Sequence, residues 1–473
     1  MQKGSYPSLR KALRGGIALG LSRIYYLALR ATYLYLLVDQ IGVPAYGAFS
    51  YAQSWYVLLL PIAVWGGNEL LLSGLLQRSG ARQRDFVGTA LTLRLTLGLL
   101  CFLTILSVAL FVEERNDLRL LMIVFAQGVV LRSVTAVATS LCVARGRSLD
   151  WVLISSVSTT IEVPLVLGLA KSGATLPTLA LAHTSIWWLT LGASFCLYSF
   201  RFGAIRLAWD RKLALWFLHE GAILGLASFL MLALSPALLL TYRYLTPGLA
   251  ELGTVAVVLQ VFTIAQQLLT LATNALLPAL RGPTSSEGCN LVGFTRSALS
   301  VALCIGGAIA LISHTAIPQL LTILPTTPFD EALSLLAQHA WVFTPLLVVS
   351  TCRLALIASG ETRSFLLAML GATASALLVL LSASVSESLN PQSVLHGIGV
   401  GLSVGAVLQL SFCYFLGFLS VEDRRSFLHL AGLITIITVS WLGRSSVPPA
   451  LLGSLGAFLL ILGVRQFLRL RKL

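Results

Sequence analysis

Residues 17–38 read IALGLSRIYYLALRATYLYLLV, a run apolar enough to enter a bilayer that nevertheless carries Arg23, Tyr26, Arg30 and Tyr33. At roughly 100° per residue of α-helix, these four side chains fall within a stripe about 80° wide. Arg30 lies roughly 20 Å from the start of the helix, beyond the midplane of a hydrocarbon core about 30 Å thick. An arginine at the midplane costs on the order of 2.5–3.5 kcal/mol on insertion scales. The stripe therefore predicts a helix that faces a wet cavity rather than lipid.

The composition of the whole chain points to a polytopic membrane protein. Of its 473 residues, 57% are hydrophobic and 11% are charged, and the mean hydropathy is +0.89, whereas a soluble domain carries about 25% charged residues. Apolar runs of about 20 residues recur from end to end. We attribute the net charge of +14 to basic cytoplasmic loops rather than to nucleic acid binding. The seven scattered cysteines form no C-x-x-C motif, so we interpret them as small core residues.

Fourteen membrane spans are predicted, joined by loops too short to hold a soluble domain. With a cytoplasmic N-terminus, the inside segments hold 21 of the 32 Lys and Arg residues, and the outside segments hold five. This asymmetry supports both the span count and the orientation, and an even number of spans places both termini in the cytoplasm. The first span is interpreted as a retained helix, not a signal peptide. The predicted spans are 15–38, 44–66, 86–111, 118–142, 150–170, 176–200, 214–243, 250–280, 291–316, 333–358, 364–384, 393–419, 426–443 and 448–466.

An internal repeat relates the first six spans to the next six. Gly47 matches Gly253 at an offset of 206, and a step of six spans gives both halves the same membrane orientation. Such a parallel repeat, with a pseudo-two-fold axis along the membrane normal, is typical of two-lobed transporters. The predicted fold is therefore all-α, with six-helix lobes in 1–213 and 214–420 and two additional helices in 421–473. The other matches pair Leu13, Gly16, Leu19, Gly20 and Leu21 with Leu218, Gly221, Leu224, Gly225 and Leu226, and Ala144-Arg145-Gly146 with Ala358-Ser359-Gly360.

Two short motifs follow the first span. Residues 41–50 read IGVPAYGAFS, and the second span ends in WGGNE at 65–69. Together with the Ala-x-Gly endings of spans four and ten and with Pro278 late in span eight, this pattern resembles bacterial polysaccharide flippases of the O-antigen type. These flippases belong to the multidrug/oligosaccharidyl-lipid/polysaccharide (MOP) exporter superfamily. The resemblance covers residues 1–420 loosely and 1–80 best.

The resemblance implies a V-shaped, two-lobed protein that works by alternating access. It also implies export of an undecaprenyl-diphosphate-linked oligosaccharide from the inner to the outer leaflet of the bacterial cytoplasmic (inner) membrane. Such export would serve the biosynthesis of cell-surface polysaccharide, including lipopolysaccharide. The implied partners are the lipid-linked glycan, membrane lipids and a polysaccharide polymerase complex. Fourteen spans also resemble the lipid II flippases of the same superfamily, so lipid II stays open as an alternative cargo.

The predicted substrate site is cationic. The first lobe places Arg23, Arg30, Arg94 and Arg132 within spans against a single acid, Glu162, which leaves a net charge of about +3. A diphosphate carries about two negative charges, and arginine offers forked donors to phosphate oxygens. The alternative is structural: Arg132 pairs with Glu162, and Arg94 bonds backbone carbonyls, so that both merely hold helices together.

Tyrosines are concentrated in the same region. Seven of the twelve lie in residues 25–56. Tyr26 and Tyr33 share the arginine face, so we predict that their rings hold the first sugars of the cargo. Tyr46 and Tyr51 are expected instead in the interfacial belt that tyrosines favour.

Two titratable residues are candidates for ion coupling. Glu162 lies near the middle of span five, where a carboxyl group able to lose its charge would carry a coupling proton. Its alternative role is a static ion pair. His183 in span six is a candidate proton relay, or else a core histidine with satisfied hydrogen bonds. We expect no cofactor, and coupling to a gradient of H⁺ or Na⁺.

Other functional classes fit less well. Membrane glycan polymerases, ligases and glycosyltransferases handle similar lipids, but they need a sizeable extramembrane loop or an acidic metal-binding cluster, and this chain has no DxD motif. It also has no G-x-x-x-x-G-K-[ST] phosphate loop. A multidrug exporter of cations would favour a negative cavity. The sequence therefore predicts a non-enzymatic, secondary-type transporter.

Overall fold

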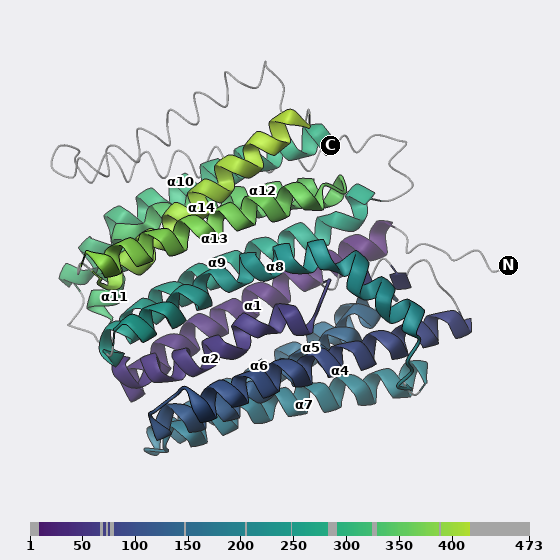
Figure 1. The fold of residues 1–473 in the computed structure, drawn as a ribbon, viewed down its shortest axis with the longest axis horizontal. Coiled ribbons are helices and arrows are strands. Elements are labelled where there is room, and N and C mark those ends of the chain that lie inside the picture. Colours follow the sequence, from purple (N-terminus) through teal and green to yellow (C-terminus); the bar gives the residue numbers. More distant parts are fainter. Residues whose placement is uncertain are drawn as a thin grey trace. The chain divides into compact units, whose positions relative to one another are not determined.

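A computed structural model describes most of the chain, and every regular element in the described residues is a helix (Figure 1). The described residues are 9–66, 70–71, 74–75, 80–145, 148–203, 206–246, 248–281, 291–323, 329–386 and 389–416. The helices are α1 (Leu9–Ile41), α2 (Val43–Ala63), α4 (Gly80–Phe111), α5 (Asn116–Ala144), α6 (Ser148–Lys171), α7 (Leu176–Phe202), α8 (Arg211–Leu245), α9 (Leu249–Arg281), α10 (Leu291–Ile323), α11 (Asp330–His339), the 3₁₀ turn η2 (Ala340–Val342), α12 (Phe343–Ala358), α13 (Thr362–Val385) and α14 (Pro391–Phe415).

These helices confirm a multi-pass membrane protein whose described part is all-helical. Twelve of the fourteen predicted spans coincide with described helices, and α11, η2 and α12 together form the tenth. Ten helices of the described part are long and apolar enough to cross a membrane. The ten do not include α1, which carries Arg23, Tyr26, Arg30 and Tyr33, or α2. The last two predicted spans, and with them the segment 421–473, lie outside the described residues. The count of fourteen therefore stays a prediction.

The chain divides into two compact units, Met1–Gly253 and Thr254–Leu473. In the first unit, α2 packs against α5 and α8, α1 packs against α6, and α5 packs against α4 and α7. In the second unit, α12 packs against α10 and α14, and α14 packs against α13. The expected lobe boundaries at 213 and 420 stay predictions.

Glycines allow a close helix contact in the first unit. A methyl group added to Gly47 on α2 would overlap the carbonyl oxygen of Leu249 and would lie 2.8 Å from the backbone nitrogen of Gly253. One added to Gly253 would in turn overlap the carbonyl oxygen of Val43. Small residues of this kind let helix backbones approach each other in membrane proteins. The two glycines that the sequence repeat equates are thus in direct contact.

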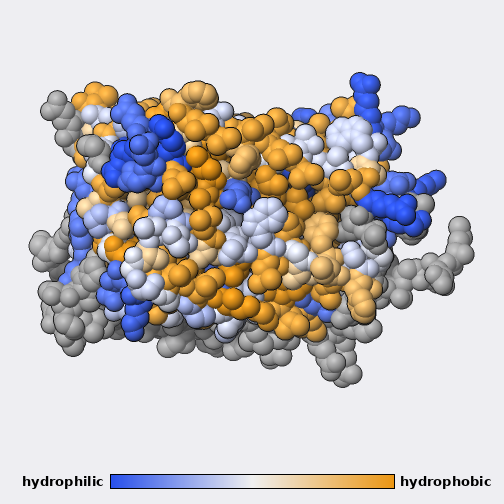
Figure 2. Space-filling model, turned by 90° about the horizontal axis from the view of Figure 1, so that it is seen from below, coloured by the Kyte–Doolittle hydropathy of each residue, from blue (hydrophilic) through white to orange (hydrophobic). Residues whose placement is uncertain are grey.

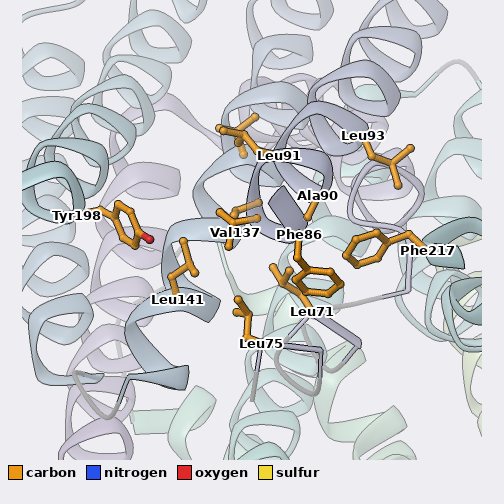
Figure 3. Close-up of a cluster of buried hydrophobic side chains, with 12 residues drawn as sticks. Leu71, Leu75, Phe86, Ala90, Leu91, Leu93, Val137, Leu141, Tyr198 and Phe217 are labelled. Carbon is orange, nitrogen blue, oxygen red and sulfur yellow. The ribbon is translucent and has the colours of Figure 1, made fainter. Parts of the chain in front are cut away.

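A cluster of buried hydrophobic side chains joins α4, α5, α7 and α8 (Figure 3). Phe86 of α4 stacks on Phe217 of α8, with ring centroids 4.8 Å apart. Trp65, just after α2, donates a hydrogen bond from its Nε1 to the carbonyl oxygen of Leu218 (3.0 Å). The cluster consists of Leu71, Leu75, Phe86, Val87, Ala90, Leu91, Leu93, Val134, Val137, Leu141, Tyr198 and Phe217.

Large apolar side chains also cover the outside of the molecule. On α4, Leu100 is 56% exposed and Leu103 is 52% exposed. Figure 2 shows one face on which hydrophobic residues predominate and hydrophilic residues gather toward the ends. Such surface is costly in water and favourable against lipid.

Two tyrosines lie elsewhere than the sequence predicts. Tyr46 is 5% exposed and Tyr51 is fully buried, so their expected place in a lipid-facing belt is wrong. Tyr51 donates a hydrogen bond to Glu113 Oε2 (2.8 Å), in the turn between α4 and α5. The phenol thus has a carboxylate partner within the protein and needs no partner at the membrane interface.

The start of α14 is held by a reciprocal cap. Asn390 Oδ1 accepts a hydrogen bond from the backbone nitrogen of Ser393 (3.0 Å), and Ser393 Oγ accepts one from the backbone nitrogen of Asn390 (3.4 Å). We expect Asn390→Ala to lower the free energy of unfolding by about 1 kcal/mol, because an alanine leaves the helix donor unpaired. Thermal unfolding in detergent measures this, with Asn390→Asp, which keeps the acceptor oxygen, as the matched control. Equal unfolding temperatures for the two variants would contradict the capping role.

Candidate functional site

Arg30 sits at the contact between α1 and α6, and its guanidinium bonds a single carboxylate. Its Nη1 lies 2.7 Å from Glu162 Oε1, and the side chains of Arg30 and Glu162 are only 11% and 4% exposed. Arg30 Nε donates to Tyr26 Oη (3.1 Å), one helical turn earlier. The guanidinium carbon also lies 5.5 Å and 5.4 Å from the ring centroids of Tyr26 and Tyr33. Helical spacing brings these three side chains together, as residues three and four apart share a face.

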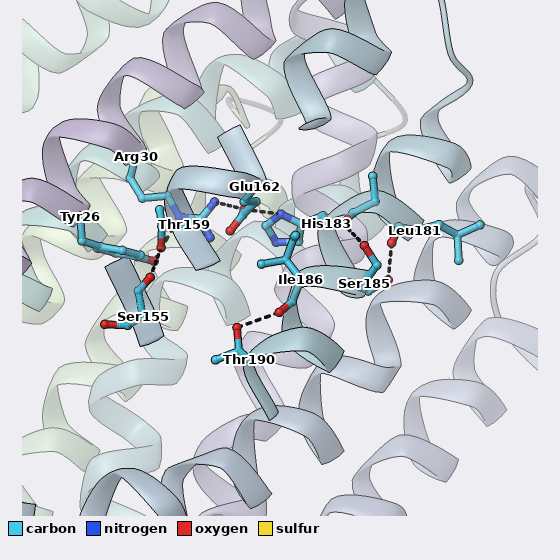
Figure 4. A network of polar contacts seen from close by, with 12 residues as sticks. Tyr26, Arg30, Ser155, Thr159, Glu162, Leu181, His183, Ser185, Ile186 and Thr190 are labelled. Atoms are coloured by element: carbon cyan, nitrogen blue, oxygen red, sulfur yellow. Dashed lines mark hydrogen bonds and ion pairs between the residues drawn. The ribbon is translucent and has the colours of Figure 1, made fainter. Parts of the chain in front are cut away.

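The same carboxylate oxygen extends the network to α7. Glu162 Oε1 lies 2.7 Å from His183 Nδ1, so Figure 4 shows a continuous line of contacts from Arg30 through Glu162 to His183. The imidazole is fully buried. Four aromatic rings surround it, with centroids 4.8–6.4 Å from its own: Tyr33, Phe49, Phe125 and Trp187. Aromatic rings thus enclose the His183 end of the Arg30–Glu162–His183 contacts. In such an apolar environment, electrostatic interactions are stronger than in water.

A second arginine borders this network. The Arg132 guanidinium of α5 lies 5.5 Å from the ring centroid of Trp187, one of the rings around His183. With a neutral imidazole, two arginines against one carboxylate leave a local charge of about +1. Arg94 is buried on α4, where its backbone carbonyl accepts a hydrogen bond from Ser133 Oγ (3.5 Å). The side chain of Arg23 lies outside the described residues.

The structure therefore brings most of the predicted site residues into one region of the first unit. Tyr26, Arg30, Tyr33, Arg132, Glu162 and His183 all belong to it. The partner of Glu162, however, is Arg30, whereas the structural alternative had assigned Arg132. On the arginine face of α1, Tyr33 is buried (6% exposed), whereas Tyr26 and Arg30 are partly exposed.

Sequence reasoning missed the hydroxyl groups that precede Glu162 on α6. Residues 155–162 read SSVSTTIE, so five of seven positions before the glutamate carry a hydroxyl. Thr159 donates to the carbonyl oxygen of Ser155 (2.9 Å), and Thr160 Oγ1 lies 2.7 Å from Tyr25 Oη on α1. The sequence feature that could have identified them is the high density of Ser and Thr in an otherwise apolar span. Because such side chains bond their own helix, they are tolerated in a membrane and remain able to contact a polar ligand.

Comparisons with known proteins show the fold of the chain. A solved multidrug resistance MATE family transporter of the MOP superfamily, in an inward-facing conformation, aligns with a TM-score of 0.60 and 12% identity, covering 90% of this chain and 100% of that one. The lipid II flippase MurJ, in an inward closed conformation, aligns with a TM-score of 0.61 and 13% identity over 97% of this chain and 99% of that one. A MOP superfamily transporter from Pyrococcus furiosus aligns with a TM-score of 0.51 and 13% identity over 90% and 97%.

No protein-family model and no curated protein sequence matches the chain. The structural neighbours nevertheless cover 90–97% of the chain. The chain therefore has the fold of the MOP superfamily transporters.

Proposed function

We propose that this protein is a flippase that moves an undecaprenyl-diphosphate-linked oligosaccharide from the inner to the outer leaflet of a bacterial cytoplasmic membrane, for cell-surface polysaccharide biosynthesis. The observation that carries the proposal is the buried Arg30, held by one carboxylate, in a protein with a MOP transporter fold. A buried arginine is expensive in a membrane and marks a functional site by default. Both termini are cytoplasmic in this proposal, and a polysaccharide polymerase complex receives the glycan.

The site works by exchange of anions on Arg30. Without cargo, Glu162 satisfies the guanidinium. A diphosphate offers several oxygens in the geometry that arginine binds with two parallel hydrogen bonds, so it displaces Glu162 from Arg30. Arg132 supplies the second positive charge. Tyr26 and Tyr33, which already lie against Arg30, then face the first sugars.

This exchange requires a proton. Two arginines balance about two negative charges of a diphosphate, which leaves Glu162 as an uncompensated buried charge. Because burial disfavours that charge, Glu162 takes up a proton when the cargo binds. His183 Nδ1 lies 2.7 Å from the carboxylate and is a group able to exchange this proton with it. Cargo binding and proton uptake are thereby linked, which makes H⁺ the preferred coupling ion.

Lipid II is the second candidate cargo. It is favoured by the alignment with a lipid II flippase over 97% of this chain, although 13% identity establishes shared fold only. Both cargoes present the same diphosphate to Arg30, so the site chemistry is common to them. The attached sugars and peptide decide between them.

The test is outward exposure of lipid-linked glycans in cells lacking the protein. We expect the deletion strain to accumulate an oligosaccharide-linked lipid that membrane-impermeant labels cannot reach, and a plasmid copy of the gene to restore labelling. Accumulation of inaccessible lipid II instead would select the second candidate. Glycan that is accessible but unpolymerised in the deletion strain would overturn transport in favour of a polymerase or ligase.

Coupling through Glu162 is tested by Glu162→Gln. The amide keeps an acceptor oxygen for Arg30 but takes up no proton, so we expect flipping that no longer accelerates when a proton gradient is applied. The measurement is the ratio of flipping rates with and without the gradient in proteoliposomes, and we expect it to fall to about 1. Asp117→Asn is the matched control, since Asp117 is exposed and pairs with Arg115 outside the network. A gradient response equal to that of the wild type would remove Glu162 from the coupling role.

A further inference from the structure

The second unit contains a pair of histidines in direct contact. His339, the last residue of α11, has its Nε2 3.3 Å from Nδ1 of His396, in the second turn of α14. The rings are nearly perpendicular, at 83°, with centroids 4.6 Å apart. His339 is 1% exposed, whereas His396 is partly exposed. The pair is therefore buried on one side and reachable from the other.

Backbone carbonyls fix which ring nitrogens carry hydrogen. His339 Nδ1 lies 2.9 Å from the carbonyl oxygen of Leu335, and His396 Nδ1 lies 2.9 Å from that of Gln392. Since a carbonyl oxygen only accepts, we assign a hydrogen to each Nδ1. His339 Nε2 then has a lone pair that faces the Nδ1–H of His396. The neutral His396 ring has its own lone pair on Nε2.

The immediate surroundings are polar but carry little charge. Gln392 Nε2 donates to Gln338 Oε1 (3.3 Å), and His314 Nδ1 of α10 lies 3.2 Å from the carbonyl oxygen of Ala337. Asp330 and Glu331 lie in the first turn of α11, at the opposite end of that helix from His339. The other described charged residues on the packed elements are Arg296 on α10, Arg353 on α12 and Arg363 on α13.

We propose that His339 and His396 form a proton-binding site of the second unit that holds one proton. A proton from water adds to the Nε2 lone pair of His396. The resulting imidazolium shares its Nδ1–H between the carbonyl oxygen of Gln392 (2.9 Å) and His339 Nε2 (3.3 Å), and its positive charge turns the contact with His339 into a charge-assisted hydrogen bond. A second proton would have to occupy His339 Nε2, where it would meet the His396 N–H and place two cations side by side. The pair therefore accepts one proton and resists the next.

The proposal goes beyond the flippase function and does not depend on its cargo. In the predicted topology, α11 and α14 both begin at the outside face, so the site exchanges protons with the external medium. It gives the second unit a proton-binding group of its own, separate from Glu162 and His183. The first proton strengthens the contact between α11 and α14. An external pH low enough for the pair to take up this one proton therefore stabilises the packing of α11 against α14.

The experiment counts protons taken up by purified protein in lipid nanodiscs between about pH 8 and pH 5, the range in which histidines titrate. Compared with the wild type, we expect the double variant His339→Gln/His396→Gln to take up about one proton fewer, because a coupled pair titrates as a unit. A loss of two protons in the double variant would show independent histidines, and a loss of none would show no site; either result overturns the proposal.

A second measurement needs no variant. The chain has six histidines, and ¹⁵N spectra of histidine-labelled wild-type protein distinguish neutral rings from imidazolium rings. We expect a pH interval in which two rings report one shared proton, through a hydrogen bond between nitrogens. Spectra in which no neutral ring accepts a hydrogen bond from an imidazolium would overturn the proposal, whether or not the variants fold.

Discussion

Arg30→Ala is expected to abolish outward exposure of the lipid-linked glycan and to destabilise the protein, and a second substitution separates the two effects. Removing one partner of a buried ion pair costs about 3–5 kcal/mol, because the other charge stays buried and unpaired. Glu162 is that other charge, 4% exposed in its side chain. Arg30→Met combined with Glu162→Met replaces both charges by apolar groups, which is often neutral for stability. We therefore expect the double variant to recover most of the unfolding temperature, short of the loss at buried His183, whose Nδ1 no longer has a carboxylate beside it, but not to recover transport.

The measurement is labelling of the glycan on intact cells at matched protein levels. Arg115→Ala is the control, because Arg115 is an exposed arginine whose ion pair with Asp117 (2.7 Å) lies at a helix end, and surface pairs contribute about 0–1 kcal/mol. We expect labelling at the wild-type level in this control. Transport by a stable Arg30→Met/Glu162→Met variant would show that the pair only holds α1 against α6.

Gly47→Leu is expected to prevent accumulation of folded protein. Even a methyl group at this position overlaps the carbonyl oxygen of Leu249 in the first turn of α9, and the obstacle is backbone, which cannot rotate away as a side chain can. Overpacking of this kind costs about 1–3 kcal/mol, and occasionally more. We expect Gly47→Ala to lower the unfolding temperature and Gly47→Leu to leave little monodisperse protein after size-exclusion chromatography.

Two other helical glycines provide the control. A methyl group at Gly168 on α6 or at Gly192 on α7 would meet nothing within 4 Å. In a helix, Gly→Ala at an unobstructed position is favourable by roughly 0.8–1.0 kcal/mol. We thus expect Gly168→Ala and Gly192→Ala to maintain or raise the unfolding temperature. If Gly47→Ala behaves as they do, α2 and α9 are not held by this contact.

Helical periodicity explains how much of the site was predictable. Positions 26, 30 and 33 must share a face in any α-helix, so the sequence placed Tyr26, Arg30 and Tyr33 together before any neighbour was known. The partner of Glu162 was less accessible. It depends on how α1 is rotated and shifted against α6, and hydropathy contains no information on that register. Arg132 and Arg30 were equally available to the glutamate in the sequence, and only the packing selected Arg30.

The same limit explains where the predicted elements differ from the helices. Hydropathy marks the part of a helix that crosses the bilayer, so the third span was predicted from 86, whereas α4 begins at Gly80 and includes the polar residues Arg82, Arg84 and Asp85. Tyr51 was assigned to an interface from residue type alone. Its carboxylate partner Glu113 is 62 residues away in the chain, beyond the reach of local pattern.

The pairing of Arg30 with Glu162 also has a consequence for how the protein is made. The two residues are 132 positions apart, so the ribosome completes α1 long before it completes α6. At about 5–20 residues per second, the interval is on the order of ten seconds. During that time, the first helix carries a midplane arginine with no acid to meet it. We therefore expect α1 to remain beside the insertion machinery, where water and protein can shield its charge, and to enter the bilayer fully only when α6 arrives with Glu162.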